Sequence, residues 1–244
     1  MTDQLPVLDV RRLGRKSYAE VHELQEQLVA QRVAGEIPDT LILVEHEPII
    51  TVGRKGGLSA EGGGGSLGGV PVVEVERGGE ATYHGPGQVV AYPILLLPEG
   101  RRDLHAYLRD LEGIVLSVLA ELDIEGRREP GLTGVWIGDK KVASIGVAVR
   151  RWVTWHGLAL NVHTDLEAFG SFQPCGLAPG VMTRIADHAD VPPALILFEV
   201  LVVKHVLETF GLRLPDAPAL EGPGGAPTDD EVDGKGFPKL PLLP

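Results

Sequence analysis

The sequence predicts an α+β fold in which helices flank a mixed or mostly antiparallel sheet. Three segments repeat their apolar residues at helical spacing, and several short apolar runs typical of strands lie between them. The last three runs are separated by gaps too short for a crossover helix, which favours antiparallel hairpins over βαβ units. With 43% hydrophobic and 23% charged residues, the 244-residue chain has an ordinary globular composition.

The first helix is predicted at 17–33, where Ser17 and Glu20 form a capping-box pattern ahead of apolar residues at helical spacing. The helix at 102–122 is predicted from a continuous apolar stripe, and the helix at 192–210 is predicted from a strongly apolar run. The other predicted elements, in order, are strands at 40–45, 70–76 and 88–97, a helix at 102–122, strands at 134–137, 141–149 and 151–162, and a helix at 192–210.

Two segments differ from the rest in composition. Residues 56–69 are rich in glycine but lack a GxxxxGK[ST] pattern, so we expect a flexible connection and no phosphate-binding loop. Proline, glycine and acidic residues dominate from about residue 215, which predicts disorder. We therefore expect one folded domain at 1–215 and an acidic tail at 216–244.

Charge and targeting signals exclude several classes of function. The net charge of −12 argues against general nucleic-acid binding, although part of it belongs to the tail. We see no signal peptide and no apolar run long enough to span a membrane. A single cysteine excludes an intramolecular disulfide and a CxxC metal pair. These features predict a cytoplasmic protein that does not associate with membranes.

The single cysteine, Cys175, is followed by Gly176, which leaves open backbone beside the sulfur. Such a thiol could act as a nucleophile, but a lone cysteine is more often a small, inert core residue. Other polar residues have the same two interpretations. Lys141 opens a strand of small residues, where an isolated lysine is usually solvated. His156 interrupts an apolar strand, where a lone histidine is more often a satisfied core residue than a ligand. Because His156 and His163 share no metal-like spacing with another ligand, we reject a zinc site.

Taken together, these segments resemble a known family. The sequences EHEPIITVGRK (45–55), RGGEATYHGPGQVVAYPI (77–94), KVASIGVAV (141–149), RWVTWHGLALNV (151–162) and PCGL (174–177) follow the order and spacing of the bacterial lipoate-biosynthesis octanoyltransferases. The resemblance covers about residues 8–213. It implies a catalytic domain that shares the fold of biotin and lipoate protein ligases.

The resemblance also implies an activity and its partners. Such an enzyme transfers an octanoyl group from octanoyl-acyl carrier protein to a lysine of lipoyl domains, and lipoyl-carrier protein can also serve as donor. The acceptors would be subunits of 2-oxoacid dehydrogenases and the glycine cleavage H protein. No cofactor, no metal and no ATP would be needed.

By resemblance, Cys175 would carry the acyl group as a thioester and Lys141 would lower the pKa of its thiol. Two protonation schemes remain open, because a lysine ammonium would favour the thiolate, whereas a neutral lysine would accept the thiol proton. The residues implied to line the acyl-substrate site are Arg77, Gly78, Gly79, Glu80, Ala81, Thr82, Tyr83, His84, Ser144, Ile145, Gly146, Gly157, Leu158 and Ala159.

The chain departs from the family pattern at Ala91, where glycine is usual, at residues 181–184, and in its glycine-rich insertion and tail. Three alternatives remain: an ATP-dependent ligase of the same fold, a transferase between lipoyl-bearing proteins, and an inactive module that binds lipoyl domains. Because acyl carrier proteins are acidic, we also expect one basic docking patch. It would consist of Arg11, Arg12, Arg15, Lys16, Lys140, Arg150 and Arg151.

Overall fold

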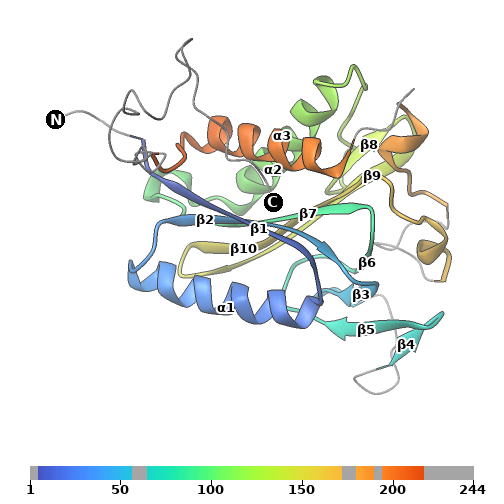
Figure 1. Ribbon diagram of the computed structural model, residues 1–244, viewed down its shortest axis with the longest axis horizontal. Helices are drawn as coiled ribbons and strands as arrows, with labels where there is room; N and C mark the ends of the chain where they lie inside the picture. The colour runs from blue at the N-terminus through green and yellow to red at the C-terminus, as the bar shows by residue number, and fades with distance from the viewer. Residues whose placement is uncertain (1–4, 57–64, 172–179, 190–193, 217–244) are drawn as a thin grey trace, which may run out of the picture. The chain divides into compact units, whose positions relative to one another are not determined.

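The computed structural model describes residues 5–56, 65–171, 180–189 and 194–216. The chain divides into two compact units, residues 1–214 and 215–244, and all helices and strands named below belong to the first. In that unit, helix α1 lies on one face of a central sheet and helices α2 and α3 lie on the other (Figure 1).

The central sheet has six strands in the order β1-β2-β7-β10-β9-β8. Strands β1 and β2 pair in parallel and every other neighbouring pair is antiparallel, so the predicted mixed sheet is confirmed. The strands are β1 (Leu8–Lys16), β2 (Asp39–His46), β7 (Gln88–Ile94), β8 (Val135–Ile137), β9 (Lys140–Arg150) and β10 (Val153–Asn161).

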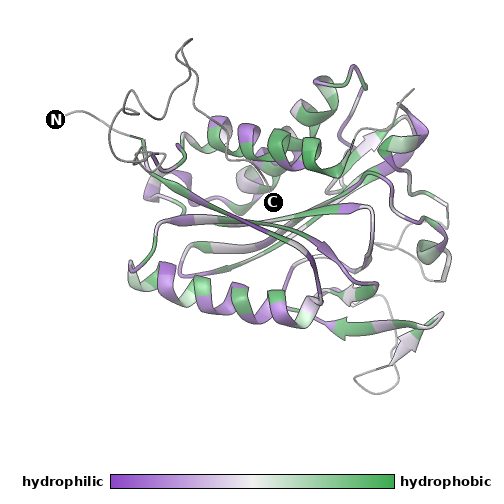
Figure 2. Ribbon diagram, viewed as in Figure 1, coloured by the Kyte–Doolittle hydropathy of each residue, from purple (hydrophilic) through white to green (hydrophobic). Residues whose placement is uncertain are grey.

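Three long helices cover this sheet: α1 (Tyr18–Ala34), α2 (Leu104–Ala120) and α3 (Leu195–Phe210). The predicted capping box at the start of α1 is present, since Ser17 and Glu20 each bond the other's backbone N–H. Helix α3 is hydrophobic over most of its length (Figure 2), and its buried residues join those of α2 in one core. Within the described residues, none of the helices combines the length and the apolar run needed to cross a membrane.

A second, smaller sheet was not predicted. It consists of β3 (Ile49–Val52), β4 (Ser66–Leu67), β5 (Val70–Glu74) and β6 (Ala81–His84), in the order β4-β5-β3-β6. Part of the predicted flexible connection at 56–69 is therefore structured, because Gly68 and Gly69, with φ of 58° and 82°, turn β4 back onto β5. Three short 3-10 helices are also described, at Glu99–Arg101, Glu167–Ser171 and Ile185–Asp187.

Several predicted boundaries move by a few residues. Strand β10 begins at Val153 and not at 151, because Arg151 and Trp152, with φ of 49° and 66°, form the tight turn after β9. Strand β7 ends at Ile94 and not at 97. Helix α3 starts at Leu195; residues 192 and 193 of the predicted helix lie outside the described residues, as does the tail from 217 onward.

Candidate active site

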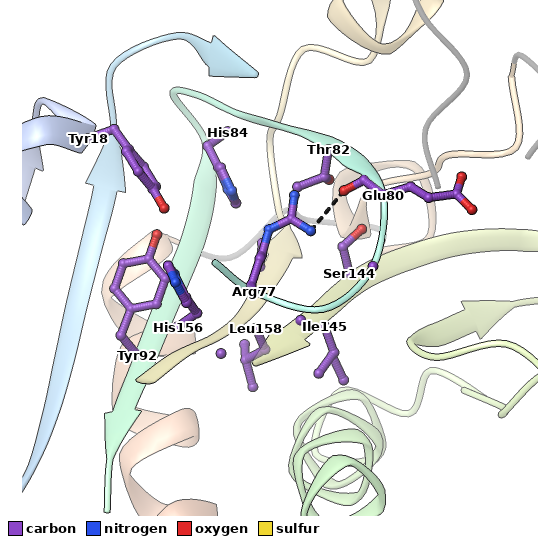
Figure 3. Close-up of a pocket in the computed structure, with 14 residues that line it drawn as sticks. Tyr18, Arg77, Glu80, Thr82, His84, Tyr92, Ser144, Ile145, His156 and Leu158 are labelled. Atoms are coloured by element: carbon purple, nitrogen blue, oxygen red, sulfur yellow. Dashed lines mark hydrogen bonds between the residues drawn. The ribbon is translucent and has the colours of Figure 1, made fainter. Parts of the chain in front are cut away.

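A cavity of about 440 Å³, measured with the part that opens to solvent, lies where α1, β6, β9 and β10 meet (Figure 3). Eleven of the fourteen residues that the resemblance assigns to the acyl-substrate site line it. They are Arg77, Gly79, Glu80, Thr82, His84, Ser144, Ile145, Gly146, Gly157, Leu158 and Ala159.

The remaining three, Gly78, Ala81 and Tyr83, do not line the cavity. Side chains alternate between the two faces of a strand, so Thr82 and His84 face the cavity while Ala81 and Tyr83 enter a separate core on the other side of β6. Gly78 instead donates its backbone N–H to the carbonyl of Val147 at 2.9 Å. It thereby anchors the loop before β6 across strand β9.

The Arg77 side chain links that loop to strand β3 by hydrogen bonds. Its Nη2 donates to the carbonyl and hydroxyl oxygens of Thr51, both at 2.8 Å, and its Nη1 donates to the carbonyl of Glu80 at 2.8 Å (Figure 3). The loop passes so close to β9 that a Cβ at Gly146 would lie 2.9 Å from the carbonyl oxygen of Gly78. Only glycine therefore fits at position 146 without displacing the cavity wall.

A buried hydrogen-bond chain begins at His84. Nδ1 of His84 donates to Oε1 of Gln88 at 2.8 Å, because the amide group of Gln88 is committed as a donor to Asn161 Oδ1 at 2.9 Å. The second ring nitrogen of His84 then accepts from the Thr51 hydroxyl at 3.3 Å. Asn161 donates in turn to the carbonyl of Thr183 at 3.0 Å.

The imidazoles at this site are kept neutral by burial. Burial lowers the pKa of His46 to about 4, and burial together with the nearby Arg77 charge lowers that of His156 to about 3. Burial, followed by the charge of His46, holds the pKa of His84 well below its usual range. The two histidines that line the cavity, His84 and His156, are therefore uncharged at neutral pH.

Two hydroxyl groups at the cavity wall lack partners. Oγ1 of Thr82 and Oγ of Ser144 are buried and accept or donate no hydrogen bond among the described residues. Figure 3 shows both on the Glu80 side of the cavity, whereas Ile145 and Leu158 point the other way, toward the core formed with α2. Buried polar groups ordinarily find a partner, so these hydroxyls are suited to bind a ligand oxygen.

Lys141 is the second residue of strand β9, before the cavity-lining residues of that strand, and is only 2% exposed. Its Nζ lies 5.2 Å from the centre of the Trp136 ring. It borders a second cavity with Lys55 and Thr133, and Gly79 and Glu80 line both cavities. The two cavities are thus neighbours across the loop before β6.

Cys175 lies outside the described residues, so its predicted approach to Lys141 stays a prediction. The described chain resumes beside Lys141. The backbone N–H of Lys141 donates to the carbonyl of Val181 at 2.7 Å, and that of Thr183 donates back to the Lys141 carbonyl at 2.9 Å. Residues 181–184, where the sequence departs from the family pattern, therefore lie beside the start of β9.

Sequence reasoning did not assign three residues of the cavity wall: Tyr18, Tyr92 and His156. Tyr18 counts toward the apolar face of α1, and His156 looks like a core histidine, so their residue types give no local signal. Ala91, where glycine is usual in the family, lies in the core beneath α2 and α3 and lines neither cavity.

The prediction of a single basic docking patch is wrong. Lys140 and Arg150 stand at opposite ends of the 11-residue strand β9, about 30 Å apart at the usual rise of a strand. The four cations of the N-terminal group pair with carboxylates, for example Arg12 with Glu199 at 3.4 Å. The other pairs are Arg11 with Asp9, Arg15 with Glu45 and Lys16 with Glu20.

Comparison with known proteins identifies the family of the chain. The family described as lipoyl protein ligase A/B catalytic domain matches residues 17–206. An octanoyltransferase from Syntrophotalea carbinolica is 42% identical over 210 residues, which are 85% of this chain and 97% of that protein. One from Rubrobacter xylanophilus is 50% identical over 184 residues, 72% of this chain and 82% of that protein.

Solved structures confirm the fold. A putative lipoate protein ligase from T. acidophilum superposes with a TM-score of 0.69 at 15% identity, covering 86% of this chain and 88% of that one. A lipoate-protein ligase A bound with ATP gives a TM-score of 0.64 at 16% identity, covering 88% and 89%. The chain therefore belongs to the octanoyltransferases, acyltransferases built on the catalytic domain of lipoyl protein ligases A and B.

Proposed function

We propose that this enzyme transfers an octanoyl group from octanoyl-acyl carrier protein to a lysine of a lipoyl domain, through a thioester on Cys175. The acceptors would be subunits of 2-oxoacid dehydrogenases and the glycine cleavage H protein, in the cytoplasm, and lipoyl-carrier protein would serve as an alternative donor. The observation that carries this proposal is the cavity, lined by the implied acyl-site residues and adjoining the buried Lys141.

The cavity suits a medium-length acyl chain. Gly146 and Gly157 are paired in the register of β9 and β10. Because both lack side chains, no side chain projects from them into this part of the cavity. Ala159, on the same face of β10 as Gly157, adds apolar surface. An octanoyl chain has about six methylenes worth roughly 0.8 kcal/mol each when buried, so the cavity could contribute about 5 kcal/mol to donor binding.

Two acyl transfers account for the reaction. In the first, the Cys175 sulfur attacks the donor carbonyl carbon, and the carrier leaves as a thiol that takes up the proton. In the second, the amine of the acceptor lysine attacks the Cys175 thioester; the C–N bond forms, the C–S bond breaks, and the amine proton returns to the sulfur. Lys141 would assist either as an ammonium that stabilises the thiolate or as a neutral amine that holds the thiol proton.

Both transfers pass through a tetrahedral oxyanion, which requires hydrogen-bond donors at the carbonyl oxygen. The unpartnered hydroxyls of Thr82 and Ser144 support this part of the proposal, since each can rotate to donate into the cavity. We assign them to the acyl carbonyl. They stand at the end of the cavity that adjoins Lys141 through Gly79 and Glu80.

An ATP-dependent ligase is the competing function, because a lipoate-protein ligase of the same fold is described with bound ATP. A ligase activates a free acid and needs no nucleophilic thiol, whereas exchange of one thioester for another is nearly isoenergetic. Cys175 therefore favours transfer without ATP.

The test is to incubate the protein with octanoyl-acyl carrier protein in the absence of ATP and to measure its intact mass. We expect one octanoyl adduct on the native protein and none on Cys175→Ser, with both proteins unfolding at the same temperature. Adding a lipoyl domain should then discharge the adduct. An adduct that forms only with ATP and free octanoate would identify a ligase, and persistence of the adduct in Cys175→Ser would exclude this cysteine as the acyl carrier.

A further inference from the structure

Three potential metal ligands meet at the end of the cavity remote from Lys141. His22 comes from α1, Glu76 from the segment between β5 and β6, and His156 from β10. Their ligand atoms all lie within 4.8 Å of one another. Nε2 of His22 lies 3.1 Å from Oε2 of Glu76, and Nε2 of His156 lies 3.9 Å from the same oxygen.

The buried member of this group is His156, which is only 2% exposed. Its Nε2 has no hydrogen-bond partner among the described residues, although leaving such an atom buried and unpaired costs about 1–3 kcal/mol. This nitrogen lies 3.9 Å from Oε2 of Glu76. The group therefore contains a buried imidazole nitrogen that is available to coordinate a metal ion.

The backbone holds His156 in that orientation at an energetic cost. Its φ of 54° lies in the left-handed region, which costs a residue other than glycine about 1–2 kcal/mol. The side chain of Gln25 in α1 compensates by accepting the His156 backbone N–H at 2.9 Å. Strain maintained in this way often marks a functional position.

The donor set is suited to zinc. Two imidazoles and one carboxylate, with a water as fourth ligand, form a common tetrahedral zinc site, in which neighbouring ligand atoms lie about 3.3 Å apart. A neutral imidazole coordinates zinc through one ring nitrogen, and Nε2 of His156 is free of hydrogen bonds among the described residues. His22 and Glu76 are partly exposed, so their side chains can close the remaining distance around the fixed His156.

The surrounding charges also permit a cation. Oε2 of Glu26 lies 3.9 Å from Nδ1 of His22, and a small movement of this exposed side chain would let it accept the Nδ1–H of a zinc-bound imidazole. The opposing charges are those of Arg77, whose guanidinium is hydrogen-bonded to the carbonyl oxygens of Thr51, Gly78 and Glu80, and of Arg150, which borders a cavity with Glu26 and Glu76. The carboxylates of Glu26 and Glu76 offset these two charges, so a bound Zn²⁺ would face no net positive charge from these groups.

We propose that His22, Glu76 and His156 bind one zinc ion, a property beyond octanoyl transfer. Because His156 lines the acyl cavity and His22 belongs to α1, the bound ion would join that helix to the cavity wall.

The test uses the full chain without an affinity tag, in a Cys175→Ser background so that the thiol cannot take the metal. Zn²⁺ titrated into this protein should bind with a stoichiometry of one. A paramagnetic Co²⁺ probe should quench Trp155, whose ring stacks on His156 with 4.4 Å between ring centres. The quenching should disappear in Trp155→Phe while the stoichiometry of Zn²⁺ binding is kept.

Two variants at the partly exposed ligands separate binding from folding. His22→Gln and Glu76→Gln should each weaken Zn²⁺ binding at least tenfold, and Zn²⁺ should no longer raise their unfolding temperature. The matched control is His205→Gln, since His205 also lies near two carboxylates, with Nδ1 2.8 Å from Glu208 and Nε2 3.5 Å from Glu121. This control should bind Zn²⁺ as the parent does.

Several results would overturn the proposal. They are an absence of saturable binding in the parent protein, unchanged affinity in His22→Gln and Glu76→Gln, or a Co²⁺ ion that leaves Trp155 fluorescence intact. Loss of binding in His205→Gln would place the ion elsewhere and would equally refute the assignment.

Discussion

The position of Lys141 depends on a glycine that faces it. Gly134 has a φ of 134°, and a Cβ there would lie 2.6 Å from Cε of Lys141 and 2.5 Å from the carbonyl oxygen of Ala143. Its N–H donates to Oε1 of Glu112 at 3.1 Å, and this carboxylate, only 1% exposed, also accepts from two arginines. A buried carboxylate thus fixes the backbone of Gly134, and the missing side chain leaves room for the lysine.

We therefore predict that Gly134→Ala displaces Lys141. Overpacking and backbone strain should together reduce stability by about 2–3 kcal/mol, and the transfer rate should fall at least tenfold because the lysine moves. The measurements are denaturant unfolding and the rate of adduct formation from octanoyl-acyl carrier protein. Gly138→Ala is the control for a positive-φ glycine in open surroundings: its φ of 55° costs alanine only about 1–2 kcal/mol, and no described atom lies within 4 Å of the new methyl group. If Gly134→Ala is destabilised yet transfers at the native rate, the position of Lys141 is not critical.

Helix α1 shows how a structural element serves the site. Its first turn carries Tyr18 and its second His22, and both contact the aromatic groups around the cavity, His46 and Trp155 among them. The helix begins where the sequence predicts, since the Ser17 side chain accepts the N–H of Glu20 and Glu20 bonds back to Ser17. A cap of two residues therefore sets the start of the helix that closes this side of the cavity.

Removing the cap should loosen that wall. Ser17→Ala should reduce stability by about 1 kcal/mol, equivalent to roughly 2–4 °C in unfolding temperature for a domain of this size. Glu20→Gln retains an oxygen that can accept from Ser17 and should lower the unfolding temperature less. Calorimetric unfolding of the two variants checks this ranking. Equal unfolding temperatures for native protein and Ser17→Ala would show that packing alone determines where α1 begins.

The elements differ in how well their sequences predict them. The helices and the β8-β9-β10 hairpins are predicted because periodicity and turn residues act locally. Strand β1 is missed because it is rich in arginine and lies at the sheet edge, where charged side chains can reach solvent. Strand β6 is missed because its four residues lie among glycines, and only pairing with β3 makes them a strand.

The site shows the same division between local and non-local information. Motif order identifies the segments that line the cavity, but the alternation along β6 decides which of their residues do so. The group formed by His22, Glu76 and His156 could not be predicted, because its members come from three distant segments that only the folded sheet brings together. Spacing along the chain detects metal ligands only when they share one local element.

Across the whole molecule, α1 covers a network of buried neutral imidazoles. His46 and His84 lie with ring centres 5.7 Å apart, and His156 packs on Tyr92. Nδ1 of His46 faces the carbonyl of Lys16 at 3.3 Å, so its Nε2 accepts from the Tyr92 hydroxyl at 2.9 Å. These contacts require the uncharged ring and make folding sensitive to acid.

The sign of that sensitivity follows from the lowered pKa values. In the unfolded chain these histidines bind a proton near pH 6.5, whereas in the folded protein the pKa of His46 is about 4 and that of His156 about 3. Their stabilising contribution is therefore complete above pH 6.5 and is lost as the pH falls toward 4. Each such histidine should contribute up to about 1.4 kcal/mol per pH unit to the loss of stability in this window.

We predict that the free energy of unfolding, measured with denaturant at each pH, falls steeply between pH 6.5 and 4. His46→Gln should reduce this slope by up to about 1.4 kcal/mol per pH unit, because one proton fewer is taken up on unfolding. The slope is the informative quantity, since the substitution also removes buried hydrogen bonds and lowers stability at every pH. His105→Gln, at an exposed position near the start of α2, should leave the slope unchanged. If the slope is the same in His46→Gln and in the native protein, His46 is protonated as readily in the folded state as in the unfolded chain. Its burial would then not control the acid sensitivity of the fold.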